Sequence, residues 1–79
     1  MSETSPIVFV RNLPLKLDKD LLFEHFGQVG SVRQIRRGIA PKTRGTAFVV
    51  YGECAEAVAA VEQLNGRVWN DRFLSVQPS

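Results

Sequence analysis

The segment at residues 44–51, RGTAFVVY, constrains the fold of this chain more than any other part of the sequence. Its second half is rich in β-branched and aromatic residues, which favour strands, and successive side chains of a strand point to opposite faces. The two faces would carry Ala47, Val49 and Tyr51 on one side and Thr46, Phe48 and Val50 on the other. The first set suits a buried core, whereas the second displays an aromatic ring. The segment therefore predicts a strand with one buried face and one aromatic face.

The rest of the chain predicts two helices and three more strands. Strands are expected over 7–11, 31–37 and 73–77, helices between Asp18 and Gly27 and over 53–64, and a loop at 38–43. The resulting order, strand–helix–strand–strand–helix–strand, is typical of the ferredoxin-like α+β fold. In that fold a four-stranded antiparallel sheet carries both helices on one face, so the other face is left open.

Single residues define the expected boundaries. Asp18 suits the N-cap of the first helix and Gly27 its C′ stop, while Asn65-Gly66 should end the second helix. Val32 and Ile35 break strict alternation, which predicts a β-bulge in the second strand.

Other apolar and aromatic residues are expected in the core or next to it. Leu74 and Val76 would point inward from the last strand, and Phe73 outward. Trp69 is expected to cover the helix–sheet core, and His25 to pack partly on a helix surface.

Length and composition limit what the chain can be. Its 79 residues predict one domain at 7–77, preceded by a disordered leader at 1–6. The single cysteine, Cys54, excludes an internal disulfide and a cysteine metal cluster. No apolar run is long enough to span a bilayer, and no phosphate loop or nucleophile–base pair is present. We therefore expect a soluble intracellular protein that is not an enzyme, with no catalytic residues, cofactor or metal.

Charge is distributed unevenly, although the formal net charge is only +2. No Asp or Glu occurs between Glu24 and Glu53. The same stretch contains five basic residues, Arg33, Arg36, Arg37, Lys42 and Arg44. A local basic surface is typical of nucleic-acid binding. The alternative is an ordinary solvated strand edge and loop.

The segment at 44–51 also matches a known pattern. The octapeptide of the RNA-recognition-motif (RRM) family has the form K/R-G-F/Y-G/A-F-V-x-F/Y, and six of its seven defined positions agree here, Thr46 being the exception. The first strand carries the partner hexapeptide, VFVRNL, at residues 8–13. Because both motifs occur in the expected order on the expected strands, the chain resembles the RRM family. The resemblance implies RNA binding on the open sheet face.

On that face Phe9 and Phe48 would be exposed neighbours that stack on unpaired bases. Thr46 removes one of three usual rings and predicts weaker binding of single strands, although its hydroxyl can hydrogen-bond. The expected RNA-binding residues are Phe9, Arg11, Arg36, Arg44, Thr46 and Phe48. The alternative is that the face packs against protein, for which the expected contacts are Phe48, Val50 and Phe73.

Four segments carry a narrower resemblance: RNLP at 11–14, FG at 26–27, VRQIR at 32–36 and TRGTAFVVY at 43–51. They are similar to the small branch-site-contacting RRM subunits of splicing factor 3b, which also have the threonine. The resemblance implies a nuclear spliceosomal protein that docks on the large HEAT-repeat subunit and presents the ring at position 9 to the pre-mRNA branch-point adenosine.

This sequence differs from those subunits in two features. They usually have tyrosine where this chain has Phe9, and they continue into a C-terminal extension, whereas this sequence ends at Ser79. We therefore expect a smaller or different peptide interface. The alternative function is a stand-alone RRM that binds single-stranded RNA through its sheet face.

Overall fold

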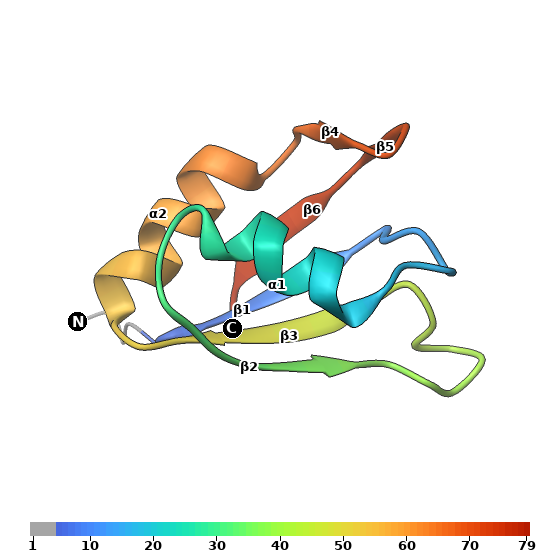
Figure 1. Cartoon of the computed structure of the whole chain (residues 1–79), viewed down its shortest axis with the longest axis horizontal. Helices are drawn as coiled ribbons and strands as arrows, with labels where there is room; N and C mark the ends of the chain where they lie inside the picture. The colour runs from blue at the N-terminus through green and yellow to red at the C-terminus, as the bar shows by residue number, and fades with distance from the viewer. Residues whose placement is uncertain (1–4) are drawn as a thin grey trace.

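The computed structural model describes residues 5–79, so residues 1–4 of the expected leader lie outside the described part. The carbonyl of Pro6 accepts a 2.7 Å hydrogen bond from the Tyr51 amide, which ties the start of the described chain to the domain. The elements are β1 (Ile7–Arg11), α1 (Lys19–Gly27), β2 (Val32–Arg37), β3 (Ala47–Tyr51), α2 (Cys54–Leu64), β4 (Val68–Trp69), β5 (Arg72–Phe73) and β6 (Ser75–Pro78) (Figure 1).

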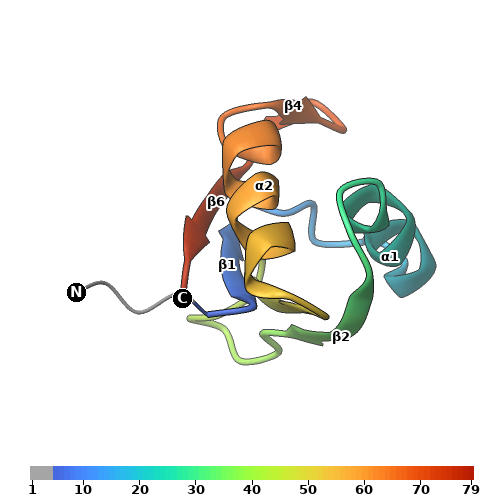
Figure 2. The same cartoon turned by 90° about the vertical axis from the view of Figure 1, so that its left-hand side faces the viewer.

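The sheet and the two helices form two layers. Strands β2, β3, β1 and β6 lie side by side in that order, and each pair is antiparallel. Both helices cover the same face of this sheet, and no helix of the described chain covers the other face (Figures 1 and 2). The arrangement confirms the ferredoxin-like α+β fold that the element order predicted.

The core lies between the sheet and the helices. Leu22 and Phe26 of α1 and Ala60 of α2 are fully buried there, against the inward residues of the strands. Tyr51 is buried as expected, and its hydroxyl donates a 2.9 Å hydrogen bond to the Phe26 carbonyl. The bond satisfies both polar groups inside the core and ties β3 to the end of α1.

Both helices begin and end close to the predicted residues. Asp18 occupies the N-cap position of α1, but its side chain makes no capping hydrogen bond. The expectation that Gly27 is a C′ stop is wrong, because Gly27 is the last residue of α1 and the next residue keeps a right-handed helical conformation. Helix α2 begins with a capping box between Glu53 and Glu56. It ends as expected at Asn65-Gly66, where the glycine has a φ of 78°.

Strand β3 begins three residues later than the octapeptide predicted. Gly45 has a φ of 82°, in the left-handed region that glycine tolerates, so a turn ends at Gly45 and the strand starts at Ala47. The Gly45 carbonyl accepts a 2.9 Å hydrogen bond from the Leu13 amide, which ties this turn to the end of β1. Arg44 therefore lies beyond the sheet, near the carboxyl end of β1.

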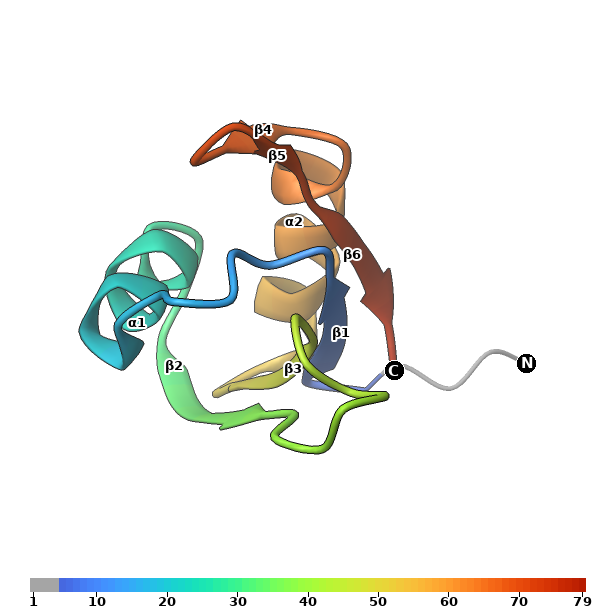
Figure 3. The same ribbon diagram turned by 90° about the vertical axis from the view of Figure 1, so that its right-hand side faces the viewer.

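The expected last strand, at 73–77, is divided in two. Strand β5 pairs with β4 in a separate two-stranded ribbon, and only β6 joins the main sheet (Figure 3). Asn70 and Asp71 form the turn of the ribbon with φ values of 56° and 66°, as in a type I′ hairpin. Between the ribbon and β6, Leu74 is buried as predicted, as is Val76 on β6.

The β-bulge predicted in β2 is confirmed, between Val32 and Gln34. Beyond it Ile35 is buried, while Gln34 and Arg36 are exposed. They pair in register with the residues of β3 that face away from the helices.

Candidate nucleic-acid interface

Four strands in register build the open face of the sheet. Phe9 pairs with Phe48 on one side and with Gln77 on the other, and Phe48 pairs in turn with Arg36. Paired residues share a face of a sheet. The open face comprises Ile7, Phe9 and Arg11 of β1, Gln34 and Arg36 of β2, Phe48 and Val50 of β3, and Ser75 and Gln77 of β6.

Phe9 and Phe48 form the aromatic centre of this face. Their ring centroids lie 4.9 Å apart with the planes tilted by 39°, a favourable geometry for an aromatic pair. Phe48 keeps 43% of its surface exposed, and Phe9 is partly exposed. The expectation that these two rings are neighbours on the open face is confirmed. Together they offer a planar ligand a stacking surface.

A shallow groove of about 560 Å³ opens between the aromatic pair and the loop from β2 to β3; we call it the Phe48 groove. Its lining residues include Phe9, Phe48, Thr46 and four basic residues, Arg11, Arg36, Arg37 and Lys42. No carboxylate of the described residues lines it, so the local potential is positive. An aromatic floor with cations around it suits an unpaired base and its phosphate.

Thr46 stands where the family has a third aromatic ring. Its hydroxyl donates a 2.6 Å hydrogen bond to the Thr43 carbonyl and so fixes the loop between β2 and β3. Gly38 allows the close approach of the two ends of this loop, because a Cβ at that position would overlap the Thr43 carbonyl oxygen. The hydroxyl proton of Thr46 is therefore engaged within the chain, although its oxygen can still accept a hydrogen bond from a ligand.

A second groove, of about 550 Å³, adjoins the first at the carboxyl end of β1; we call it the Phe73 groove. Arg11 and Thr46 line both grooves. The remaining lining residues come from the segment after β1, the turn before β3, the ribbon and β6, and are Asn12, Leu13, Leu15, Arg44, Gly45, Arg72, Phe73 and Ser75. The expected site residues Arg44 and Phe73 thus lie together, but outside the Phe48 groove.

Asn12 holds the ribbon against the end of β1. Its Nδ2 donates a 2.9 Å hydrogen bond to the Phe73 carbonyl, and its Oδ1 accepts one of 2.9 Å from Nη1 of Arg72. The φ of Asn12 is 68°, in the left-handed region that asparagine adopts more readily than most residues. Neither Asn12 nor Arg72 was predicted from the sequence as a site residue. Only the place of Asn12 in the hexapeptide could have pointed to it, because its partner is 60 residues away.

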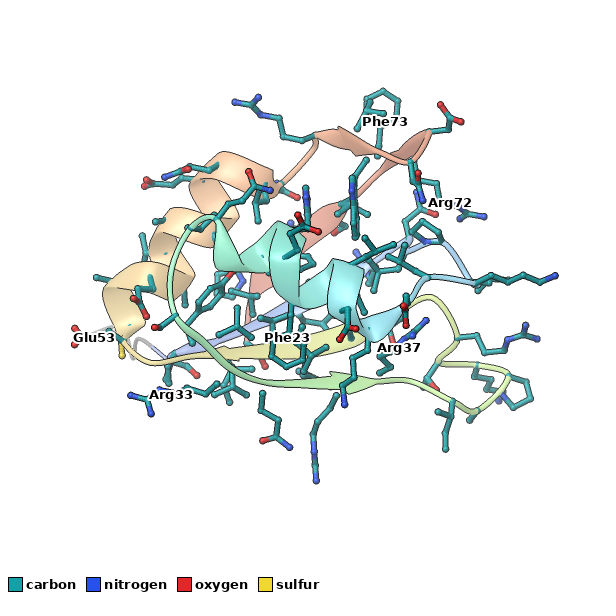
Figure 4. All side chains as sticks on the ribbon, viewed as in Figure 1. Phe23, Arg33, Arg37, Glu53, Arg72 and Phe73 are labelled. Atoms are coloured by element: carbon teal, nitrogen blue, oxygen red, sulfur yellow. The ribbon has the colours of Figure 1, made fainter. Side chains whose placement is uncertain are left out.

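The five basic residues between positions 24 and 53 do not form one surface. Arg37 lies at the edge of the Phe48 groove, but its Nη1 donates a hydrogen bond to the Leu17 carbonyl, on the helix side of β2. Arg33 lies at the other end of β2, next to Gly52 (Figure 4). The expectation of a single basic surface is therefore wrong for Arg33 and for the guanidinium of Arg37, because alternation and the bulge direct them away from the open face. The other three border the grooves: Arg36, Lys42 and Arg44.

The opposite end of the open face is apolar. Ile7 and Val50 pair there and are partly buried, and the neighbouring residue of β2 is the uncharged Gln34. Ile7 is at the start of β1, whereas the ribbon contacts the chain just after the other end of β1, through Asn12. The length of β1 therefore separates the apolar end from the ribbon. The three expected protein contacts thus do not form one patch, because Phe48 is central while Val50 and Phe73 lie toward opposite ends.

Other chemical sites are not evident in the described part of the chain. None of its His, Cys, Asp and Glu residues gather in a group that could hold a metal ion. No described helix has the length and apolar character needed to cross a membrane.

The fold and the two strand motifs define the family. Residues 8–75 match the RNA recognition motif, and the chain belongs to the RNA recognition motif family. Within it, the chain is similar to splicing factor 3B subunit 6 of Drosophila melanogaster, with 45% identity over 74 residues, and to the splicing factor 3B subunit 6-like proteins of Schizosaccharomyces pombe and Arabidopsis thaliana, with 45% and 40% identity over 74 residues. These sequences confirm the narrower resemblance to the small RRM subunits of splicing factor 3b.

The alignments cover 94% of this chain and 61%, 64% and 60% of the three relatives, so the chain spans about three fifths of their length. Among solved structures, the chain superimposes on the RNA15 RRM with a TM-score of 0.89 at 24% identity, covering 98% of this chain and 92% of that one. The Rna15 RRM with bound RNA (GU) gives 0.86 at 24% identity, covering 95% and 83%. At this identity the likeness shows the fold.

Proposed function

We propose that this chain is the RNA-binding domain of a nuclear subunit of splicing factor 3b. In this proposal the domain contacts the pre-mRNA branch-point adenosine and docks on the large HEAT-repeat subunit. The observation that carries RNA binding is the partly exposed Phe9–Phe48 pair on the floor of a groove without carboxylates. Similarity to splicing factor 3B subunit 6 proteins supports the assignment to the splicing factor.

The chemistry of the Phe48 groove supports binding of an unpaired base. An aromatic face stabilises a stacked base by roughly 1–3 kcal/mol. Arg36 pairs with Phe48 on β2, and Arg11 lies two residues beyond Phe9 on β1, so each borders the aromatic pair and can meet a phosphate. Thr46 leaves the groove with one aromatic pair rather than three rings, and this smaller platform suits a single bulged base.

The apolar end of the open face supports docking on a protein. Ile7 and Val50 present aliphatic side chains without a basic neighbour in the sheet. Apolar surface of this kind binds a protein segment by burial. In this arrangement a protein segment and a nucleotide share the face, with Phe48 at the boundary between them.

A duplex with one bulged adenosine, compared with the same duplex fully paired, tests the RNA contact by fluorescence anisotropy. We expect the bulged duplex to bind more tightly, and Phe9→Leu and Phe48→Leu each to weaken it by about tenfold or more, because leucine keeps apolar volume but cannot stack as a ring does. Phe23→Leu, on the helix side, is the matched control (Figure 4). Equal affinity for the two duplexes, or no loss with Phe48→Leu, would refute the proposed contact.

Copurification with the large HEAT-repeat subunit tests the docking. We expect Val50→Ser to reduce recovery of that subunit in nuclease-treated extracts, since a hydroxyl replaces apolar contact area. Val58→Ser is the matched control, because Val58 is 46% exposed on α2, on the other layer of the fold. Equal recovery with both variants would contradict docking on this end of the sheet.

A stand-alone RRM is the second candidate function, favoured by the two adjoining basic grooves, which share Arg11 and Thr46. Such a protein binds several phosphates, so its affinity for RNA falls steeply with salt. Recovery of no stable protein partner after nuclease treatment, together with a steep salt dependence, would support this candidate over the docked subunit.

A further inference from the structure

The Phe73 groove combines the two kinds of group that a nucleotide needs. Three arginines line it, one each from β1, the turn before β3 and β5: Arg11, Arg44 and Arg72. No carboxylate of the described residues lines it, so the groove attracts an anion. Phe73 supplies an aromatic ring that is 67% exposed.

The ring of Phe73 is carried by a fixed piece of backbone. Asn12 accepts a hydrogen bond from Arg72 and donates one to the Phe73 carbonyl. On the other side of the ribbon, the amide of Leu74 donates to the Arg67 carbonyl at 3.0 Å, and the amide of Gly66 donates to the Leu74 carbonyl at 2.8 Å. These bonds hold the ribbon in place before any ligand arrives, which lowers the entropic cost of binding.

The two grooves adjoin each other at two shared residues. Arg11 and Thr46 belong to the lining of both, so a chain leaving the Phe48 groove past Arg11 enters the Phe73 groove. Neighbouring nucleotides of a strand share one phosphate, and Arg11 stands where that phosphate would pass. A nucleic-acid strand therefore fits the alternation of ring, cation and ring along this path.

We propose that the Phe73 groove is a second nucleotide subsite, which stacks the base next to the one on Phe9 and Phe48 against Phe73 and holds its phosphate among Arg44, Arg72 and Arg11. The subsite rests on the proposed RNA binding of the Phe48 groove. It takes any base, because a phenylalanine ring offers a stacking face without hydrogen-bonding groups. The contacts extend the interface beyond the four strands of the sheet to the ribbon.

An unstructured single-stranded RNA of about eight nucleotides tests the subsite, with its affinity for the chain measured by anisotropy across a salt series. We expect Phe73→Leu to weaken binding several-fold, with Phe23→Leu as the matched control. Arg72→Gln should reduce the slope of log affinity against log salt by about 0.7, the value for one phosphate of a single strand. Arg67→Gln, an exposed arginine that lines neither groove, should leave the slope unchanged.

Ring protons of Phe73, followed by NMR during titration with the same RNA, give a direct readout of stacking, and we expect them to shift upfield. Unchanged affinity and salt slope in Phe73→Leu and Arg72→Gln, with Phe48→Leu still impaired, would overturn the subsite and leave the proposed RNA binding intact. Unchanged RNA affinity in Phe48→Leu as well would overturn both the subsite and the proposed RNA binding of the Phe48 groove. Loss of the large protein subunit from Phe73→Leu, with RNA affinity unchanged, would make the groove a protein contact and also overturn the subsite.

Discussion

The imidazole of His25 lies flat against the indole of Trp69, with ring centroids 4.0 Å apart and planes within 3° of parallel. His25 belongs to α1 and Trp69 to β4, so the stack joins the first helix to the ribbon. The ring of Phe26 is nearly perpendicular to both, at centroid distances of 5.3 Å from His25 and 6.4 Å from Trp69. Trp69 thus covers the core as expected, and His25 packs partly against it.

This stack predicts a pH-dependent stability. Burial lowers the pKa of His25 below its ordinary value of 6.5, so the unfolded chain binds the proton more tightly than the folded one. The contribution of neutral His25 to the free energy of unfolding should therefore be complete above about pH 6.5, and it should be lost as the pH drops below that value. We expect the urea midpoint to decrease between pH 7.5 and pH 5.5.

His25→Phe is the control for this prediction, because it keeps an aromatic ring against Trp69 but does not titrate. His25 is the single histidine of the sequence, so the variant should show a smaller change of midpoint over the same pH range. An equal change in both proteins would assign the pH dependence to other groups.

The hydroxyl of Tyr51 predicts a second effect on stability. Tyr51→Phe removes one donor to the Phe26 carbonyl, which still accepts a hydrogen bond from the Val29 amide at 3.4 Å. A hydrogen bond of this kind contributes about 0.5–1.5 kcal/mol, and we expect the free energy of unfolding to fall by that amount. Urea denaturation at pH 7.5 measures it. An unchanged midpoint would mean that water replaces the hydroxyl at the end of α1.

Much of the fold follows from local pattern. Alternation over 47–51 assigns Val49 and Tyr51 to the core and Phe48 to the open face, because the side-chain period of a strand is fixed by its backbone. The same rule places Phe9 on β1. Two central strands with one ring each, in an order that makes them neighbours, are enough to predict the aromatic pair.

What the pattern could not predict depends on short elements and distant partners. Strands β4 and β5 have two residues each, too few for alternation to be visible. The bond of Arg37 to Leu17 and that of Arg72 to Asn12 join positions far apart in sequence. The direction of a long basic side chain is set by such a partner, and so the two grooves could not be separated from the charge pattern alone.

Gly38 and Gly27 predict opposite responses to alanine. A Cβ at Gly38 would overlap the Thr43 carbonyl oxygen, whereas a Cβ at Gly27 would have no heavy atom within 4 Å. We expect Gly38→Ala to shift the loop from β2 to β3, lower stability by about 1–3 kcal/mol and weaken RNA binding in the Phe48 groove. Gly27→Ala, at the last position of α1, should be neutral or stabilise by up to about 1 kcal/mol. Thermal denaturation and RNA titration of the pair measure both effects, and equal behaviour of the two variants would argue against a close contact at Gly38.

Loss of the Asn12 side chain is predicted to loosen the ribbon and to leave the core folded. Asn12→Gly keeps a residue that tolerates the φ of 68° but loses both side-chain hydrogen bonds to the ribbon. Asn12→Ala loses the same bonds and also places an alanine in the left-handed region, at a further cost of about 1–2 kcal/mol.

We expect amide hydrogen exchange in the ribbon to accelerate in both variants, because the ribbon keeps only its own pairing, its bonds to residues 66–67 and the stack of Trp69 on His25. The amides of β1 and β3 should keep their protection in Asn12→Gly, since the strand pairing between them does not involve the side chain of Asn12. Global loss of protection in Asn12→Gly would mean that this side chain supports the whole sheet. Unchanged exchange in the ribbon would mean that the bonds to residues 66–67 and the stack of Trp69 on His25 are enough to hold it.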